Sequence, residues 1–295
     1  MRLIAAFLLI LPCVLAAPVD DVVEIQGEFT SLRLAPGAGG FVERFESLAT
    51  KLNMAGGEGI LQEGFGVGNF YAPNRRLNEK LEVVDTVQDR PVLQYSYDCD
   101  GPNIKGLHVT RTVEPLPDEA SIRVTWKIEH KGTEAQWVAP WVRNDVTAGG
   151  AYEKTDRIDI PSVDGVLNAD HDRYLLAARN WAAVTDPQAK ESLCGVFNAD
   201  QVHSFLAERN DEKQFGAIQT AFVPKLMNPG DTWQTVYRVN LISGLTRVDF
   251  ATDELATQIE YRDGKLEVYV SASKRMKGLQ MQASVRAANK RVWRL

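Results

Sequence analysis

Strict alternation of apolar and polar residues in one ten-residue segment constrains this chain more than any other feature. In Ser121–His130, SIRVTWKIEH, residues 122, 124, 126 and 128 are Ile, Val, Trp and Ile, and the residues between them are polar or charged. Successive side chains of a strand point to opposite faces, so this pattern predicts a strand with one buried face. Further short strands, separated by glycine and proline, precede and follow it. The sequence therefore predicts an all-β fold, a sandwich of antiparallel strands.

Three segments depart from this simple pattern. Met54–Asn69 contains six glycines, which predicts a long loop. Pro140 within Gln136–Asn144 predicts an edge strand or a bulge, because proline cannot donate to a strand ladder. Asp249–Ile259 has apolar residues four apart, which predicts a short connecting helix. After it, too few strands remain for a second sandwich, so we expect a partial small β domain.

The N-terminus predicts export. MRLIAAFLLILPCVLAAPVDD has one basic residue, an apolar run to Ala17 and then small residues, as a secretory signal peptide does. The run is short for a membrane anchor, which needs roughly 20 apolar residues. We therefore expect a signal peptide at 1–16, a main β domain at 17–248, and the connector and partial domain at 249–295. The protein would be secreted or periplasmic. Cys99 and Cys194 would then either form one disulfide or remain buried thiols.

A tryptophan-rich strand supplies the candidate ligand-binding residues. Trp137, Trp141, Arg143 and Asp145 would project from one face of an extended strand. Indole rings can cover the C–H groups of a sugar, and charged side chains can bind its hydroxyls, so these residues predict a carbohydrate site. The alternative is that the tryptophans belong to the core and that the two charges pair. Further along the chain, Arg179 and Trp181 offer the same chemistry and the same alternative.

Charge distribution bears on partners. The formal net charge is −6, yet Ser271–Leu295 contains seven basic residues and no acidic one. This segment either forms the solvated faces of strands or contacts an anionic surface, such as an acidic glycan or a lipid. An exported chain with an acidic body is not expected to bind nucleic acid. The sequence contains no metal-ligand spacing, phosphate loop or nucleophile motif, so we expect no metal and no cofactor.

The order of segments resembles the galactose-mutarotase-like β-supersandwich of aldose epimerases and of sugar-binding domains. The resemblance rests on Gly59–Phe65, Gly106–Asn144 and Asn228–Leu245. It implies one large antiparallel supersandwich, with a short C-terminal β extension, that holds a sugar on the concave face of a sheet.

The resemblance also suggests further site residues. Asn74-Arg75-Arg76 is similar to the substrate-binding Asn-Arg pair of aldose epimerases, which makes Arg76 a candidate. Catalysis there needs a carboxylate base and an imidazole acid. The histidine-rich signature of the family is missing, and the candidates for these two roles are Glu63 and His171.

Three hypotheses follow from the sequence. The first is an exported protein that binds an oligo- or polysaccharide without transforming it. The second is an enzyme of the same fold, either an aldose epimerase or an enzyme of the glycoside hydrolase or lyase kind. The third is a structural envelope protein that docks through its basic C-terminal segment. The sequence leaves open whether the chain is an enzyme.

Overall fold

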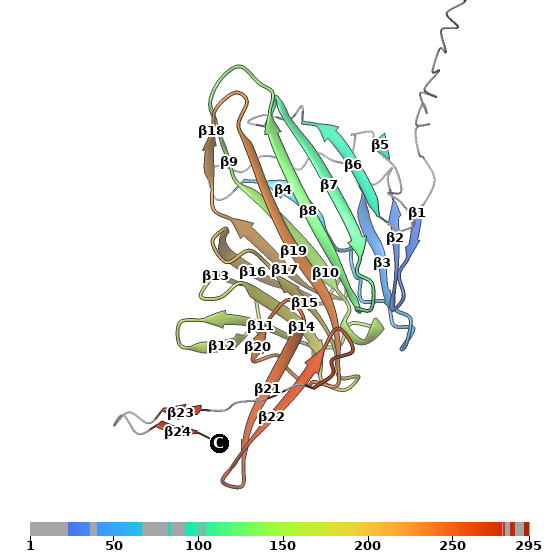
Figure 1. Cartoon of the computed structure of the whole chain (residues 1–295), viewed down its shortest axis with the longest axis vertical. Helices are drawn as coiled ribbons and strands as arrows, with labels where there is room; N and C mark the ends of the chain where they lie inside the picture. Colours follow the sequence, from blue (N-terminus) through green and yellow to red (C-terminus); the bar gives the residue numbers. More distant parts are fainter. Residues whose placement is uncertain are drawn as a thin grey trace, which may run out of the picture.

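Two large antiparallel sheets form the body of the protein (Figure 1). The structure is a computed structural model, and it describes residues 23–35, 40–66, 82–83, 92–99, 101, 104–278, 280, 284–286 and 292–294. The predicted signal peptide and Arg76 lie outside the described residues. Spatial order in the nine-stranded sheet is β12 (Gly165–Asn168), β11 (Arg157–Ser162), β14 (Trp181–Asp186), β15 (Glu191–Val196), β19 (Thr232–Ser243), β8 (Ser121–His130), β7 (Leu107–Pro115), β6 (Leu93–Asp98) and β5 (Glu82–Val83). The five-stranded sheet has the order β13 (Arg173–Leu176), β16 (Val202–Asn210), β17 (Phe215–Phe222), β10 (Pro140–Val146) and β4 (Gln62–Phe65).

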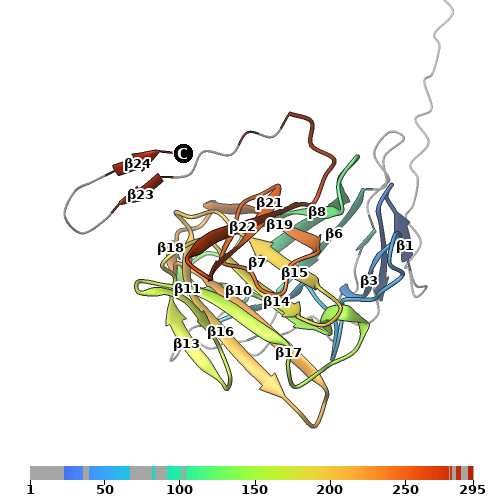
Figure 2. The ribbon, with the colours of Figure 1, turned by 90° about the horizontal axis from the view of Figure 1, so that it is seen from below.

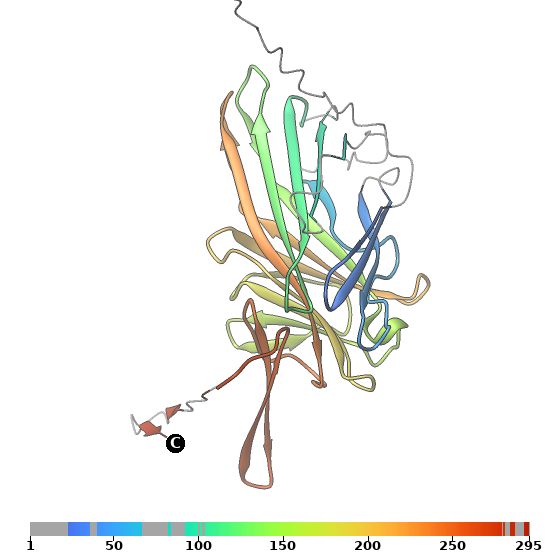
Figure 3. The same cartoon turned by 45° about the vertical axis from the view of Figure 1, so that its right-hand side comes forward.

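Smaller sheets surround this body. They comprise β1 (Val23–Gln26), β2 (Thr30–Ala35) and β3 (Phe41–Ser47); β9 (Gln136–Val138) with β18 (Lys225–Met227); β20 (Phe250–Ala251), β21 (Leu255–Arg262) and β22 (Lys265–Ala272); and β23 (Ser284–Arg286) with β24 (Val292–Arg294). A 3-10 turn spans Ala148–Gly150. The β21–β22 hairpin extends beyond the two large sheets, and β23–β24 lies apart from them (Figure 3). The described residues contain no helix that is long and apolar enough to cross a bilayer.

The main core lies between the two large sheets. As predicted, Ile122, Val124, Trp126 and Ile128 of β8 are all fully buried. Trp126 packs edge-on against Trp233, with ring centroids 5.6 Å apart, and belongs to an aromatic cluster that spans both sheets. The predicted all-β supersandwich is confirmed.

A second, smaller core lies on the other side of the nine-stranded sheet. The β20–β22 sheet packs there, next to β14 and β19 (Figure 2). It buries Trp181, Cys194 and Ile242 against Ala251 and Ala256. The C-terminal β extension and the nine-stranded sheet therefore share this second core. The predicted domain boundary between residues 248 and 249 stays a prediction.

Three local predictions are wrong. The helix expected at Asp249–Ile259 is β20 and the start of β21, where alternation places Ala256 and Gln258 in the interior. The glycine-rich loop contains β4, a strand buried on both faces. Pro140 is the first residue of β10, whose later residues pair with both β17 and β4, so this strand is not at an edge. Proline is tolerated at that position because it is the first residue of the strand.

The two cysteines are buried and are not joined in a disulfide. Burial raises the pKa of the Cys194 thiol to about 12, and the charge of Asp159 adds to the rise. We predict that native Cys194 reacts with a disulfide reagent about a thousandfold more slowly than an exposed thiol, because only the thiolate is nucleophilic. Timed labelling with Ellman's reagent, with and without denaturant, measures this. Rapid labelling of the native protein at Cys194 would contradict it.

Candidate functional site

The strand registers place the predicted tryptophan, arginine and aspartate on one side of the five-stranded sheet. Val142, Thr220 and Phe205 lie in one cross-strand row and are fully buried toward the main core. Their neighbours along each strand therefore face away from the nine-stranded sheet. We call this side the outer face. It comprises Gln62 and Gly64 (β4), Trp141, Arg143 and Asp145 (β10), Ala217, Gln219 and Ala221 (β17), Ser204, Leu206 and Glu208 (β16), and Tyr174 and Leu176 (β13).

These residues form three cross-strand rows. The first row is Leu176, Ser204, Ala221, Trp141 and Gly64. The second is Tyr174, Leu206, Gln219, Arg143 and Gln62, and the third is Glu208, Ala217 and Asp145. Small residues therefore alternate with a large indole and with polar groups, so the outer face is an amphipathic platform. Its exposed or partly exposed side chains are those of Tyr174, Leu176, Leu206, Glu208, Gln219 and Arg143, and its other residues are buried.

Trp141 lies flat against β4. Its indole passes so close to Gly64 that a Cβ there would come within 2.1 Å of the ring. Trp141 keeps only 8% of its surface exposed, so a ligand on the outer face could contact only a small part of the indole. Glycine at position 64 is required by this contact, since any side chain would displace the indole.

Arg143 organises the charges of the outer face. Its Nε donates to Asp145 Oδ1 at 2.7 Å, and its Nη1 donates to Glu208 Oε2 at 2.6 Å. The guanidinium also lies 5.6 Å from the centre of the Phe215 ring. Burial alone would lower the pKa of Arg143, but the hydrogen bond to Glu208 and the charges of both carboxylates raise it. Asp145 Oδ2 accepts the main-chain N–H of Glu58 at 3.2 Å, which fixes the cluster rigidly. For these charges the structure bears out the alternative to the sugar-site prediction, in which Arg143 pairs with Asp145 or a neighbouring carboxylate.

The other predicted binding residues lie elsewhere. Trp137 is half exposed on β9, where it pairs with Leu226 of β18 and not with the rows of the outer face. Arg179 is exposed and donates to the main-chain carbonyl of Ala178. Trp181 is 1% exposed within the second core, so the prediction that its indole stacks on a sugar is wrong. The β20–β22 sheet covers the strand that contains Trp181, and the sequence of that strand does not reveal this cover.

Glu63 points away from the outer face, into the main core. It is fully buried, and its Oε1 lies 2.6 Å from Nη1 of the fully buried Arg111 on β7. Tyr97 donates its hydroxyl to Glu63 Oε2 at 3.3 Å, and Arg111 donates to the Leu61 carbonyl at 2.8 Å. Burial alone would lower the pKa of Arg111, but the charge of Glu63 raises it above its ordinary value. The predicted catalytic role of Glu63 is wrong, because this carboxylate ties the two sheets together.

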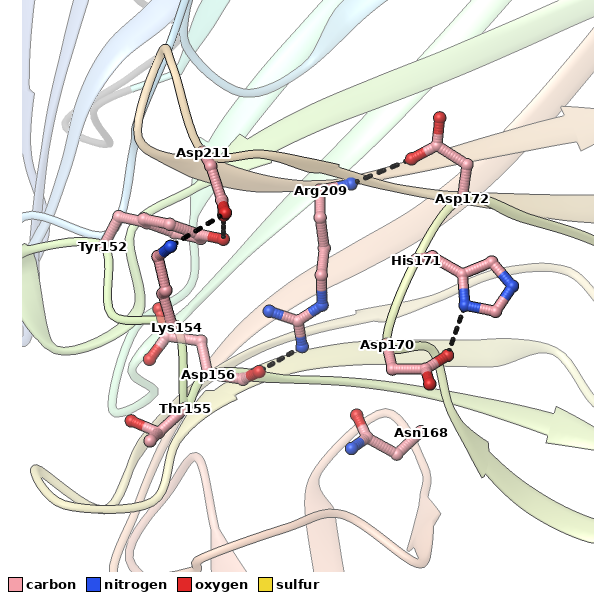
Figure 4. Close-up of a pocket in the computed structure, with 10 residues that line it drawn as sticks. All are labelled: Tyr152, Lys154, Thr155, Asp156, Asn168, Asp170, His171, Asp172, Arg209 and Asp211. Carbon is pink, nitrogen blue, oxygen red and sulfur yellow. Dashed lines mark hydrogen bonds and ion pairs between the residues drawn. The ribbon is translucent and has the colours of Figure 1, made fainter.

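His171 lies on the rim of an open cleft of about 870 Å³ at the edge of the sandwich (Figure 4). We call it the edge cleft: it is bounded by the segment before β11, the β12–β13 loop and the end of β16. His171 is more than half exposed, and its Nδ1 lies 2.6 Å from Asp170 Oδ1. His171 therefore has an acidic neighbour, but the cleft that it borders is separate from the outer face.

Asp156 in the edge cleft is a titratable group that the sequence analysis missed. It is 2% exposed, and burial raises the pKa of its carboxyl to about 7, helped by the charge of Asp186. Its Oδ2 accepts the main-chain N–H of Glu153 at 3.1 Å. Its Oδ1 has no hydrogen-bond partner in the part of the chain that the structure describes. No local sequence signal distinguishes Asp156 from a solvated loop aspartate. Among the described residues, no group of three or more His, Cys, Asp or Glu side chains is arranged to hold a metal ion.

Comparisons with known proteins bear on the fold. No protein-family model matches the sequence, and no curated protein matches it. Solved structures do match: a galactose mutarotase-like protein from Clostridium acetobutylicum (TM-score 0.59, 10% identity, 76% of this chain and 95% of that chain) and another from Lactobacillus casei (0.58, 11%, 75% and 100%). A galactose mutarotase related enzyme from Lactobacillus acidophilus also matches (0.55, 8%, 76% and 98%).

Proposed function

We propose that the chain, which has the galactose-mutarotase-like fold predicted from the order of its segments, binds carbohydrate on the outer face of the five-stranded sheet. The observation that supports this most is the row structure, in which the Trp141 indole stands beside Arg143, Gln219 and the carboxylates of Asp145 and Glu208. The indole edge provides an apolar contact for a sugar ring, and the surrounding groups donate to and accept from its hydroxyls. We infer an oligo- or polysaccharide as the ligand, since the accessible part of the platform extends from Arg143 on β10 to Tyr174 on β13.

The first test is glycan binding by the Trp141→Ala protein. We expect it to lose affinity for the bound glycan by at least about tenfold, because aromatic anchors dominate such interfaces. Binding on a glycan array, followed by titration of the best ligand, measures the loss.

Two further variants make this test specific. Gln219→Ala removes a half-buried amide next to Arg143 and is expected to weaken binding without disturbing the core. Tyr261→Ala removes a 77% exposed ring from the β21–β22 hairpin and should bind as the unmodified protein does. Circular dichroism checks that each variant is folded. Unchanged glycan affinity in folded Trp141→Ala and Gln219→Ala proteins would reject the outer face as the site.

An enzyme of the same fold is the second candidate, because an imidazole and a phenol lie beside the outer face. Tyr174 Oη is 3.4 Å from His203 Nδ1, at the β13–β16 edge of the sheet. The carboxylates nearest to Trp141 along the rows are those held by Arg143. Polarimetry on freshly dissolved aldoses separates the hypotheses: faster mutarotation that His203→Ala removes would favour an epimerase.

We also propose that the chain is exported, which the N-terminal sequence supports. N-terminal sequencing of the secreted or periplasmic protein is expected to begin at Ala17. A structural role for the basic C-terminal segment has weaker support, because Lys274 of that segment is paired with Glu254 and lies 3.9 Å from Glu119. Deletion of residues 275–295 and fractionation of the cell envelope would test that role.

A further inference from the structure

The edge cleft and the outer face lie on opposite sides of β16, because successive side chains of a strand point to opposite faces. Glu208 and Arg209 are successive residues of β16. Glu208 lies in the outer-face row with Asp145, whereas Arg209 pairs with Gly216 and projects to the opposite side of the sheet, toward the open edge of the sandwich. Ligands on the outer face and in the edge cleft would therefore contact different residues of one strand.

Arg209 and Asp156 form the floor of this cleft (Figure 4). The Arg209 guanidinium donates to the main-chain carbonyls of Asp156 and Ala169, the latter at 3.0 Å. Within the described residues, no carboxylate forms an ion pair with it, although Asp156 and Asp211 lie close enough to interact with its charge. The Asp156 carboxyl also belongs to the lining of the cleft; it is buried, and its Oδ1 has no partner in the described chain. The floor thus combines a fixed guanidinium with a buried carboxyl oxygen that has no hydrogen-bond partner there.

The rim of the cleft is rich in carboxylates. Asp211 accepts the hydroxyl of Tyr152 at 2.6 Å and lies 3.2 Å from Lys154 Nζ. The hydrogen bond from Tyr152 and that from Lys154 lower the pKa of Asp211, so it is ionised at neutral pH. Asp170 and Asp172 stand on the opposite rim, where Asp172 accepts the main-chain N–H of Arg209 at 3.2 Å. Three rim carboxylates disfavour an anionic ligand through charge repulsion.

We propose that the edge cleft is a second binding site, for a neutral or amine-bearing sugar ring whose neighbouring hydroxyls bridge Arg209 and Asp156. A sugar hydroxyl both donates and accepts hydrogen bonds, so two adjacent hydroxyls match a guanidinium next to a carboxyl oxygen. The volume of about 870 Å³ accommodates at least one ring. A phosphate, a sulfate or a uronate matches the guanidinium but is repelled by the rim. The site is independent of the outer face and does not depend on the function proposed for it.

The experiment uses the full chain carrying Trp141→Ala, so that loss of outer-face binding does not obscure the cleft. Methyl glycosides of glucose, galactose and mannose, together with glucosamine and glucuronate, are titrated into the isotope-labelled protein. Backbone amide shifts report where each probe binds. We expect at least one methyl glycoside or glucosamine to shift the signals of residues 152–156 and 168–172, and glucuronate to bind at least about tenfold more weakly.

Asp156→Asn, added to the same protein, is the decisive variant. It preserves the shape of the side chain and, with its amide oxygen accepting the Glu153 N–H, places an NH₂ group where the unpartnered oxygen stands, and we expect affinity for the bound sugar to fall about tenfold or more. Asp164→Asn is the matched control, because Asp164 is exposed in the β11–β12 turn and does not line the cleft. The proposal is overturned if no neutral or amino sugar shifts the cleft signals, if glucuronate binds best, or if Asp156→Asn binds as well as Asp164→Asn. None of these outcomes depends on whether the outer face binds a glycan.

Discussion

Replacing Arg111 with methionine is expected to lower the free energy of unfolding by about 3–5 kcal/mol. The substitution leaves the Glu63 carboxylate fully buried, with its cationic partner at 2.6 Å removed. An unpaired buried charge is far more costly than the pair itself is stabilising, because the desolvation penalty is no longer offset. Urea denaturation at pH 7, with a shared denaturant slope, measures the change.

The double variant Arg111→Met with Glu63→Met distinguishes this explanation from simple loss of packing. With both charges removed, the penalty disappears, and we expect much of the lost stability to return. If the double variant is as unstable as Arg111→Met alone, the cost comes from shape and not from charge. A loss below about 1 kcal/mol in the single variant would show that water reaches Glu63.

This buried pair also supports the outer face. Glu63 and Gly64 are neighbours on β4, so the residue that carries the carboxylate sits next to the residue on which the Trp141 indole rests. Arg111 holds Glu63 from the opposite sheet and donates to the Leu61 carbonyl at the start of β4. We infer that the ion pair fixes how closely β4 packs on the nine-stranded sheet. Because the Trp141 indole rests on Gly64, the same ion pair then also fixes the position of the indole. The strand β4 within the glycine-rich stretch is therefore held in place by contacts to both sheets.

Alternation predicted those elements whose burial is one-sided. Ser121–His130 was predicted correctly because one face meets the core and the other is more exposed. The shared face of Trp141, Arg143 and Asp145 was predicted from strand geometry alone, since β10 is buried on both faces apart from the partly exposed Arg143. Trp181 could not be interpreted this way, because β14 is buried on both faces and its sequence, WAAVTD, has no polar side to compare.

Long-range partners account for the remaining errors. Arg111 occupies the inward phase of β7, after Leu107 and Val109, and an arginine in an apolar phase is a signal that a buried acid is needed. The sequence cannot say that Glu63, in a stretch rich in glycine, is that acid. The edge cleft is harder still, since its floor joins Asp156 to Arg209 across segments that are distant in sequence. The sequence offered His171 as a candidate imidazole but could not predict the cavity beside it.

The stability of the protein is expected to depend on pH through Asp156. Its pKa is about 7 in the folded state, against 3.8 for an ordinary aspartate, because burial opposes ionisation. Between about pH 4 and pH 7 the folded state therefore binds more protons than the unfolded state. By linkage the free energy of unfolding falls as pH rises through this window, and the full penalty, on the order of 2–4 kcal/mol, is present above pH 7.

Asp156→Asn removes this titration while keeping an acceptor for the Glu153 N–H. We expect the variant to gain stability relative to the unmodified protein as pH rises, by on the order of 2–4 kcal/mol between pH 4 and pH 8. Urea midpoints at each pH give the difference, and Asp164→Asn, which changes an exposed carboxyl, should show no such trend. A difference that stays constant across the window would mean that Asp156 is already ionised in the folded state at pH 4. A growing difference would mean that the fold tolerates a destabilising carboxyl at the cleft floor, where the proposed sugar site needs an oxygen.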